Sequence, residues 1–294
     1  MGRRPVLPLI PLASLGLGKR TLIMGVLNVT PDSFSDGGLY ATTESAVECG
    51  RRLVAEGADI LDVGGESTRP ATFQDGLTLD VEEEIGRVLP VIRALSAEFP
   101  TVPISIDTYK SAVAAAALDG GATIVNDISG LTYDPGMAAL VAARKCPVVI
   151  MHILGQPKDI PAEPVYDDVV TSIAEFFHRQ IEYAYRLGVR DNQILLDPGI
   201  GFGKNASHNL EILRRLKELT DIGYPVVVGA SRKRFIGKVL NISDPLDRLE
   251  GTAATVALSI ASGASIVRVH DVKQMSRVAK MADAVVRGWV EEES

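Results

Sequence analysis

The sequence predicts an α/β protein that folds as a single (β/α)8 TIM barrel. The chain contains eight short, almost continuously apolar runs, which are typical of parallel strands buried on both faces. Amphipathic stretches separate these runs, as in strand–helix repeats. The length of 294 residues suits one large barrel as well as two small domains, and no linker-like segment divides the chain.

The elements follow one another in a regular order. The expected strands are Thr21–Val29, Asp59–Val63, Pro103–Asp107, Thr123–Asn126, Pro147–His152, Ile194–Asp197, Pro225–Gly229 and Ser265–His270. The expected helices include Glu44–Glu56, Val81–Glu98, Ala138–Arg144, Val165–Leu187 and Leu210–Leu219. Thr42 or Thr43 is the expected N-cap of the first helix and Asp80 that of the second. Left-handed C-caps are expected at Gly57, Gly120, Gly188 and Gly263.

A doubly wound sheet is the main alternative, and the first strand argues against it. A dinucleotide-binding sheet needs a GxGxxG turn after that strand, whereas this strand runs into Asn28-Val29-Thr30-Pro31-Asp32-Ser33. We expect residues 19–294 to form the barrel and residues 1–18 to form an extension or hairpin that closes its bottom.

Composition narrows the classes of partner. The net charge of −7 is opposite to that of a dedicated nucleic-acid binder. No apolar run reaches the ~18 residues of a membrane span, and Pro5, Pro8 and Pro11 interrupt the apolar N-terminal stretch. Cys49 and Cys146 lack a CxxC partner and are expected to be buried thiols. We therefore expect a cytoplasmic protein that binds neither nucleic acid nor membrane.

Every predicted strand ends in polar residues, and in a barrel these ends form one catalytic rim. The polar residues at the eight ends are Asn28; Asp62; Asp107; Asn126 with Asp127; His152; Asp197; Ser231 to Arg234; and Arg268 with His270.

Three of these residues indicate a flat ligand. Asp107, Asn126 and Asp197 place short, stiff acceptors at the ends of strands three, four and six, and a carboxylate accepts two parallel N–H bonds from a guanidine-like edge. This set suits a nitrogen-rich heterocycle in the barrel mouth. A metal cluster or a capping role is the alternative, and Asp127 fits a purely structural acceptor.

Other residues indicate a phosphate site. Arg69, Arg268 and His270 belong to strands two and eight, which are one strand apart, and arginine forks match phosphate oxygens. Asn28 lies between them on strand one and could contact Mg²⁺ that arrives with a diphosphate. A salt bridge at the rim is the alternative role for Arg268.

Two polar loops, Thr30–Gly38 and Glu66–Gly76, are long enough to act as lids over this rim. Phe34 in the first loop either lines the site or packs inward.

At these residues the sequence resembles dihydropteroate synthase, a family of the folate pathway. The matching segments are Met24–Gly38, Asp62–Pro70, Ser105–Thr108, Asn126–Ser129, Met151–His152, Leu196–Lys204, Gly229–Lys233 and Arg268–His270. They span nearly the whole chain in order, which makes the match specific.

The resemblance implies a transferase that joins 6-hydroxymethyl-7,8-dihydropterin diphosphate to p-aminobenzoate, giving 7,8-dihydropteroate and pyrophosphate. It implies a Mg²⁺ cofactor, a homodimer, and sulfonamides that compete with p-aminobenzoate. The implied pterin residues are Asp107, Asn126, Met151, Asp197, Phe202 and Lys233; the diphosphate residues are Asn28, Arg69, Arg268 and His270, with Asn28 also on the metal. The implied p-aminobenzoate residues are Phe34, Thr68, Pro70 and Lys233, and the catalytic residues are Asp32, Arg69, Asp107 and Lys233.

Two other functions remain open from the sequence. Lys233, flanked by Arg232 and Arg234, could form a Schiff base in a lyase, because neighbouring cations favour an unprotonated amine. The chain could also be a non-catalytic pterin binder or a pterin-dependent methyltransferase, although neither function needs the two rim loops.

Overall fold

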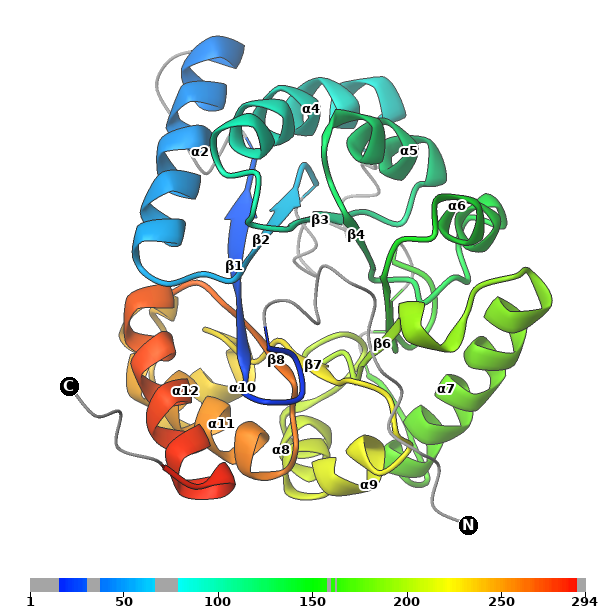
Figure 1. The fold of residues 1–294 in the computed structure, drawn as a ribbon. Helices are drawn as coiled ribbons and strands as arrows, with labels where there is room; N and C mark the ends of the chain where they lie inside the picture. Colours follow the sequence, from blue (N-terminus) through cyan, green and yellow to red (C-terminus); the bar gives the residue numbers. More distant parts are fainter. Residues whose placement is uncertain (1–15, 31–37, 67–78, 158–159, 162, 290–294) are drawn as a thin grey trace.

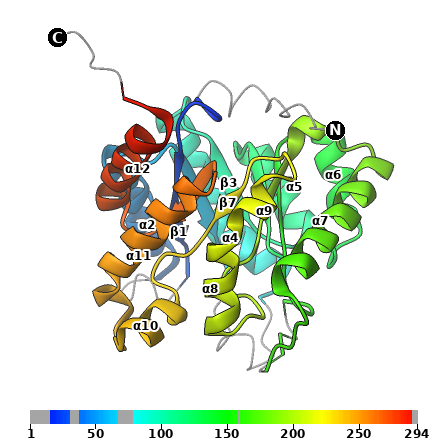
Figure 2. The ribbon, with the colours of Figure 1, turned by 90° about the horizontal axis from the view of Figure 1, so that it is seen from below.

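The computed structural model describes residues 16–30, 38–66, 79–157, 160–161 and 163–289, and here eight parallel strands are surrounded by helices (Figure 1). The strands are β1 (Leu22–Asn28), β2 (Ile60–Gly64), β3 (Ile104–Asp107), β4 (Ile124–Asp127), β5 (Val148–Met151), β6 (Ile194–Asp197), β7 (Val227–Val228) and β8 (Ile266–Val269). The helices are α2 (Gly38–Ala55), α4 (Val81–Glu98), α5 (Ser111–Gly120), α6 (Gly136–Arg144), α7 (Val169–Arg186), α8 (Ala206–Arg214), α9 (Leu216–Thr220), α10 (Arg234–Leu240), α11 (Leu249–Ala261) and α12 (Val272–Arg287). In a view turned by 90°, helices lie on both sides of the strands, with α11 and α12 on one side and α6 and α7 on the other (Figure 2).

The strands form one sheet in the order β6-β5-β4-β3-β2-β1-β8-β7. The two ends of this order meet, because Leu196 of β6 forms a parallel bridge with Val226, and its N–H donates to the carbonyl of Pro225 at 3.0 Å. The sheet therefore closes, and the predicted barrel is confirmed. As expected, β1 lies between β2 and β8, so their carboxyl ends are neighbours.

Side chains alternate between the barrel interior and the helices. On β2, Leu61 and Val63 belong to the large cluster that the strands form with the helices, whereas Ile60 belongs to a separate interior cluster. Burial on both faces explains why the strands read as continuous apolar runs. The interior cluster consists of Leu22, Met24, Ile60, Ile124, Val149, Leu195, Val227 and Ile266.

Several predicted boundaries were wrong. α2 begins at Gly38, so Thr42 and Thr43 lie inside the helix and cannot cap it. The predicted helix over 210–219 is split into α8 and α9, because the backbone of Arg215 (φ −111°, ψ 19°) leaves the helical region. The left-handed residue after α5 is Gly121 (φ +116°) rather than Gly120. The seventh strand is limited to two residues.

Some expectations concern residues outside the described part. The hairpin expected over residues 1–18 falls almost entirely there, so the division at residue 18 stays a prediction. Cys49 and Cys146 are both free thiols; Cys146 is buried as expected, and Cys49 is half-buried. No helix among the described residues has the length and apolar character needed to cross a bilayer.

The predicted cap of α4 is confirmed and can be tested. The Asp80 carboxylate accepts from the N–H of Glu82 at 2.9 Å, which satisfies one of the unpaired donors at the start of the helix. Asp80→Ala should lower the free energy of unfolding by about 1 kcal/mol in urea denaturation. Asp80→Asn is the matched control, since it keeps the side-chain oxygen; an equal loss in both variants would contradict the capping role.

Candidate active site

The carboxyl ends of the strands carry a second interior layer, which is mostly polar. Residues two apart on a strand share one face, so each strand places its next inward side chain two positions beyond its residue in the apolar layer. The residues of the apolar layer concerned are Ile60, Ile124, Val149, Leu195 and Ile266. Asp107 ends β3 at the same end of the barrel. The resulting ring consists of Asp62, Asp107, Asn126, Met151, Asp197 and Arg268.

Arg268 ties this ring together. Its Nε donates to Asp62 at 2.6 Å and its Nη2 donates to Asp107 at 2.7 Å. The Asn126 amide donates to the same Asp62 carboxylate at 3.2 Å. Asp62 is predicted from the sequence as a polar strand end without a role, and its place at the carboxyl end of β2 is the signal that it belongs to the candidate site. The salt bridge considered for Arg268 from the sequence does exist, and it lies inside the site.

Burial sets the charge state of the ring. Burial raises the pKa of Asp197 to about 6. Burial also raises the pKa of Asp107, and the positive charge of the neighbouring Arg268 partly offsets this rise. Burial, together with Arg268, lowers the pKa of Lys233 to about 8. At neutral pH Asp197 is still mostly a carboxylate and Lys233 mostly an ammonium, so the site offers both acceptors and donors.

An apolar surface lies beside the polar ring. Met151 and Phe202 share a buried cluster with Tyr109, and the Lys233 ammonium lies 4.1 Å from the centre of the Phe202 ring. Such a cation–π contact is favourable and holds both side chains in place. The structure thus brings together Met151, Phe202 and Lys233, three residues that the family resemblance assigns to the pterin.

Three of the four expected anion-binding residues, Asn28, Arg268 and His270, lie on or directly after the adjacent strands β1 and β8. Asn28 ends β1, which is paired with β8, and is half-buried. His270 follows β8, and its Nδ1 lies 3.0 Å from the Ser231 hydroxyl. Burial, and to a smaller extent the positive charge of Arg268, lowers the pKa of His270 to about 3, so this imidazole is neutral. Arg268 therefore supplies the charge at this end, and His270 can supply only hydrogen bonds.

Not every predicted residue can be placed. Asp127 faces away from the ring, where its carboxylate accepts from the N–H groups of Ser129 and Leu131, and its structural role is confirmed. His152 contacts Lys204 rather than the ring. Outside the described residues lie Asp32, Phe34, Thr68, Arg69 and Pro70.

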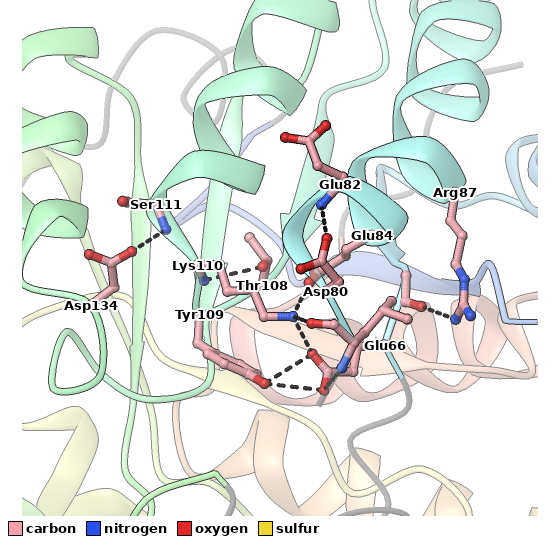
Figure 3. A network of polar contacts seen from close by, with 12 residues as sticks. Glu66, Asp80, Glu82, Glu84, Arg87, Thr108, Tyr109, Lys110, Ser111 and Asp134 are labelled. Carbon is pink, nitrogen blue, oxygen red and sulfur yellow. Dashed lines mark hydrogen bonds and ion pairs between the residues drawn. The ribbon is translucent and has the colours of Figure 1, made fainter. Parts of the chain in front are cut away.

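A buried ionic network links Glu66, shortly after β2, to the start of α4 and to the residues that follow β3 (Figure 3). The Lys110 ammonium donates to Glu66 at 2.8 Å, to Glu84 at 2.6 Å and to the carbonyl of Leu79 at 2.7 Å. The Tyr109 hydroxyl, also on the chain after β3, donates to Glu66. This network joins Glu66 and Leu79, which flank residues 67–78, to the strand that carries Asp107.

Comparison with known proteins agrees with this arrangement. The family model described as pterin binding enzyme matches residues 24–270. A dihydropteroate synthase from Synechocystis is 47% identical over 92% of this chain and 92% of its own length. A structure of the Clostridium difficile enzyme in the presence of pteroic acid has a TM-score of 0.85 and 49% identity, covering 92% of this chain and 98% of that one.

A third comparison concerns a structure with a bound aromatic amine. The Xanthomonas albilineans dihydropteroate synthase with 4-aminobenzoic acid has a TM-score of 0.84 and 43% identity, covering 90% of this chain and 93% of that one. Identity of this level over nearly the full length of each relative establishes the family. The chain belongs to the dihydropteroate synthase family of pterin-binding enzymes.

Proposed function

We propose that this chain condenses 6-hydroxymethyl-7,8-dihydropterin diphosphate with p-aminobenzoate to give 7,8-dihydropteroate and pyrophosphate. The observation that carries the proposal is the ring of Asp62, Asp107, Asn126, Met151, Asp197 and Arg268 at the carboxyl ends of the strands, with Phe202 packed beside Met151. Membership of the family supports the same reaction.

The polar ring suits the edge of the pterin. Asp107 and Asp197 accept from the paired N–H groups of the heterocycle, while Asn126 both donates and accepts. One oxygen of Asp107, Oδ1, is buried without a hydrogen-bond partner among the described residues, so a ligand N–H would satisfy an otherwise costly acceptor. Met151 and Phe202 pack against the ring faces, and Lys233 donates to the ring's acceptor atoms.

The diphosphate is proposed to bind to Asn28, Arg69, Arg268 and His270. No group of three His, Cys, Asp or Glu side chains suited to a metal was found among the described residues. The amide of Asn28 is one weak ligand, which fits a Mg²⁺ ion whose remaining ligands are diphosphate oxygens and water. When bound, Mg²⁺ would neutralise charge on the leaving diphosphate.

The chemistry then follows from charge placement. Arg268 stabilises the departing diphosphate, and the electron-rich dihydropterin delocalises the positive charge left on its methylene. We propose a dissociative, SN1-like substitution in which C–O cleavage precedes attack by the aromatic amine. Phe34, Thr68, Pro70 and Lys233 are proposed to border the p-aminobenzoate, and the proposed catalytic residues are Asp32, Arg69, Asp107 and Lys233.

The decisive assay is pyrophosphate release from the pterin diphosphate, with and without p-aminobenzoate. Formation of dihydropteroate that depends on both substrates supports the proposal, and pyrophosphate release without any condensation product would contradict it. Borohydride trapping of a substrate on Lys233 would instead support the Schiff-base lyase. A secondary deuterium isotope effect near unity at the methylene, under chemistry-limited single turnover, would exclude the dissociative step.

The metal proposal has its own expected result. Asn28→Ala should raise the Mg²⁺ concentration needed for half-maximal activity about fivefold to tenfold, because one ligand is lost; this range corresponds to about 1–1.4 kcal/mol of binding free energy. The rate at saturating Mg²⁺ and the KM for p-aminobenzoate should change much less. An unchanged Mg²⁺ requirement, measured by titration after chelation, would remove Asn28 from the metal site.

We further propose a homodimer in the cytoplasm. The neighbouring helices α11 and α12 expose the large apolar side chains of Leu258, Met281 and Val285, which a second copy could cover. Sedimentation analysis should show a dimer, and Met281→Glu with Val285→Glu should weaken it. The two free thiols are compatible with the reducing cytoplasm.

A further inference from the structure

Lys204 is a buried cation that the proposed reaction does not use. It follows β6, and its side chain turns back into the protein so that the residue is 9% exposed. Its ammonium lies 2.9 Å from Nδ1 of His152 and donates to the carbonyls of Phe202, Gly199 and His152 at 2.9, 3.0 and 3.2 Å. Among the described residues, no carboxylate lies within salt-bridge distance of it.

Such a charge is costly to bury. Removing an ammonium from water is unfavourable even after the protein relaxes, and burial here lowers the pKa of Lys204 to about 7. An apolar side chain would fill the same space without that cost. Unlike an apolar side chain, the ammonium has N–H donors. These donors bind three backbone carbonyls that lie outside any helix or strand.

Those carbonyls belong to the turn between β6 and α8 and to the end of β5. The turn is pressed tightly against β5: Gly199 has φ +66°, and a Cβ there would lie 1.9 Å from the carbonyl oxygen of His152. Lys204 bridges this contact, since it binds the Gly199 carbonyl on one side and the His152 carbonyl on the other.

The same turn positions two residues of the proposed pterin site, Asp197 and Phe202. The N–H of Gly199 donates to Asp197 at 2.7 Å, and Phe202 carries the ring on which Lys233 lies. Asp197 is also faced by the charges of Lys233 and Arg268. A shift of the turn would therefore move a hydrogen-bonding carboxylate and an apolar ring together.

We infer that Lys204 is a positioning residue for pterin recognition, which fixes Asp197 and Phe202 by locking the β6–α8 turn to the end of β5. This inference rests on the proposed function. Lys204 touches no substrate in this assignment, and its effect passes through the turn. It should therefore act much more strongly on the pterin substrate than on p-aminobenzoate, which the turn reaches only through Lys233 on the Phe202 ring.

Steady-state kinetics of Lys204→Met provides the test, because methionine keeps the length of the side chain and removes its donors. The KM for the pterin diphosphate should rise about tenfold, whereas kcat and the KM for p-aminobenzoate should change less than about threefold. Loss of folded enzyme alone would lower kcat and leave both KM values unchanged, and that result would overturn the inference. An equal rise in both KM values would overturn it as well.

Two further variants complete the design. Lys217→Met is the matched control, because Lys217 is exposed on α9, and it should behave like the wild type. If Lys204→Met does not fold, Lys204→Gln, which keeps two N–H donors and loses the charge, is measured instead; an unchanged KM for the pterin would overturn the inference. Failure of the wild type to condense the substrates would instead count against the proposed function.

Discussion

Asp197→Ala should weaken the binding of 6-hydroxymethylpterin roughly 10- to 100-fold while the barrel stays folded. Within the described residues only Oδ1 is hydrogen-bonded, to the N–H of Gly199, so the second oxygen can accept from the heterocycle. A hydrogen bond to a charged group contributes about 1.5–3 kcal/mol, which sets this range. Isothermal titration calorimetry on the free pterin measures the effect without the diphosphate or p-aminobenzoate.

The control and the pH dependence sharpen this result. Asp119→Ala removes an exposed carboxylate on α5 and should leave the pterin affinity unchanged. Because the pKa of Asp197 is raised to about 6, wild-type affinity should also fall as the pH drops below 6 and the carboxylate takes up a proton. A folded Asp197→Ala protein with unchanged affinity would remove Asp197 from the site.

The sequence was sufficient to predict the barrel and most of its polar ring. Both come from one periodicity: residues two apart share a face of a strand, so an apolar interior residue such as Leu195 is followed by a site residue such as Asp197. Since parallel strands present their carboxyl ends together, eight polar strand ends had to form one rim.

What the sequence could not show is which rim residues contact one another. Asp62 and Arg268 are 206 positions apart, and only closure of the barrel brings them to 2.6 Å. His152 looked equivalent to Asp197 as a strand end, yet it contacts Lys204 because the β6–α8 turn packs over it. The predicted helix ends were wrong where two adjacent residues are equally suited to the left-handed C-cap, as Gly120 and Gly121 are at the end of α5.

The Arg268 cluster also predicts the largest effect on stability. Arg268→Met would leave Asp62 and Asp107, which have almost no exposed side-chain area, without their cation. Breaking a buried ion pair by removing one partner costs about 3–5 kcal/mol, so the free energy of unfolding at pH 8 should fall by that amount. Urea denaturation without ligands is the measurement.

The loss should depend on pH with a definite sign. The pKa of Asp107 is raised on folding, so the folded state binds more protons than the unfolded one, and stability falls as the pH rises through the folded pKa. Without Arg268 that pKa rises further. The stability gap between Arg268→Met and the wild type should therefore be smallest near pH 5, where Asp107 is largely protonated, and largest at pH 8.

A double variant separates this charge effect from lost packing. Asp107→Asn removes one of the two uncompensated carboxylates, so Asp107→Asn combined with Arg268→Met should be more stable at pH 8 than Arg268→Met alone. If the arginine acted through its packing alone, the second substitution would restore nothing and the loss would be equal at pH 5 and pH 8. Recovery in the double variant would show that Arg268 stabilises the barrel by neutralising the carboxylates of the ring to which the proposed pterin site belongs.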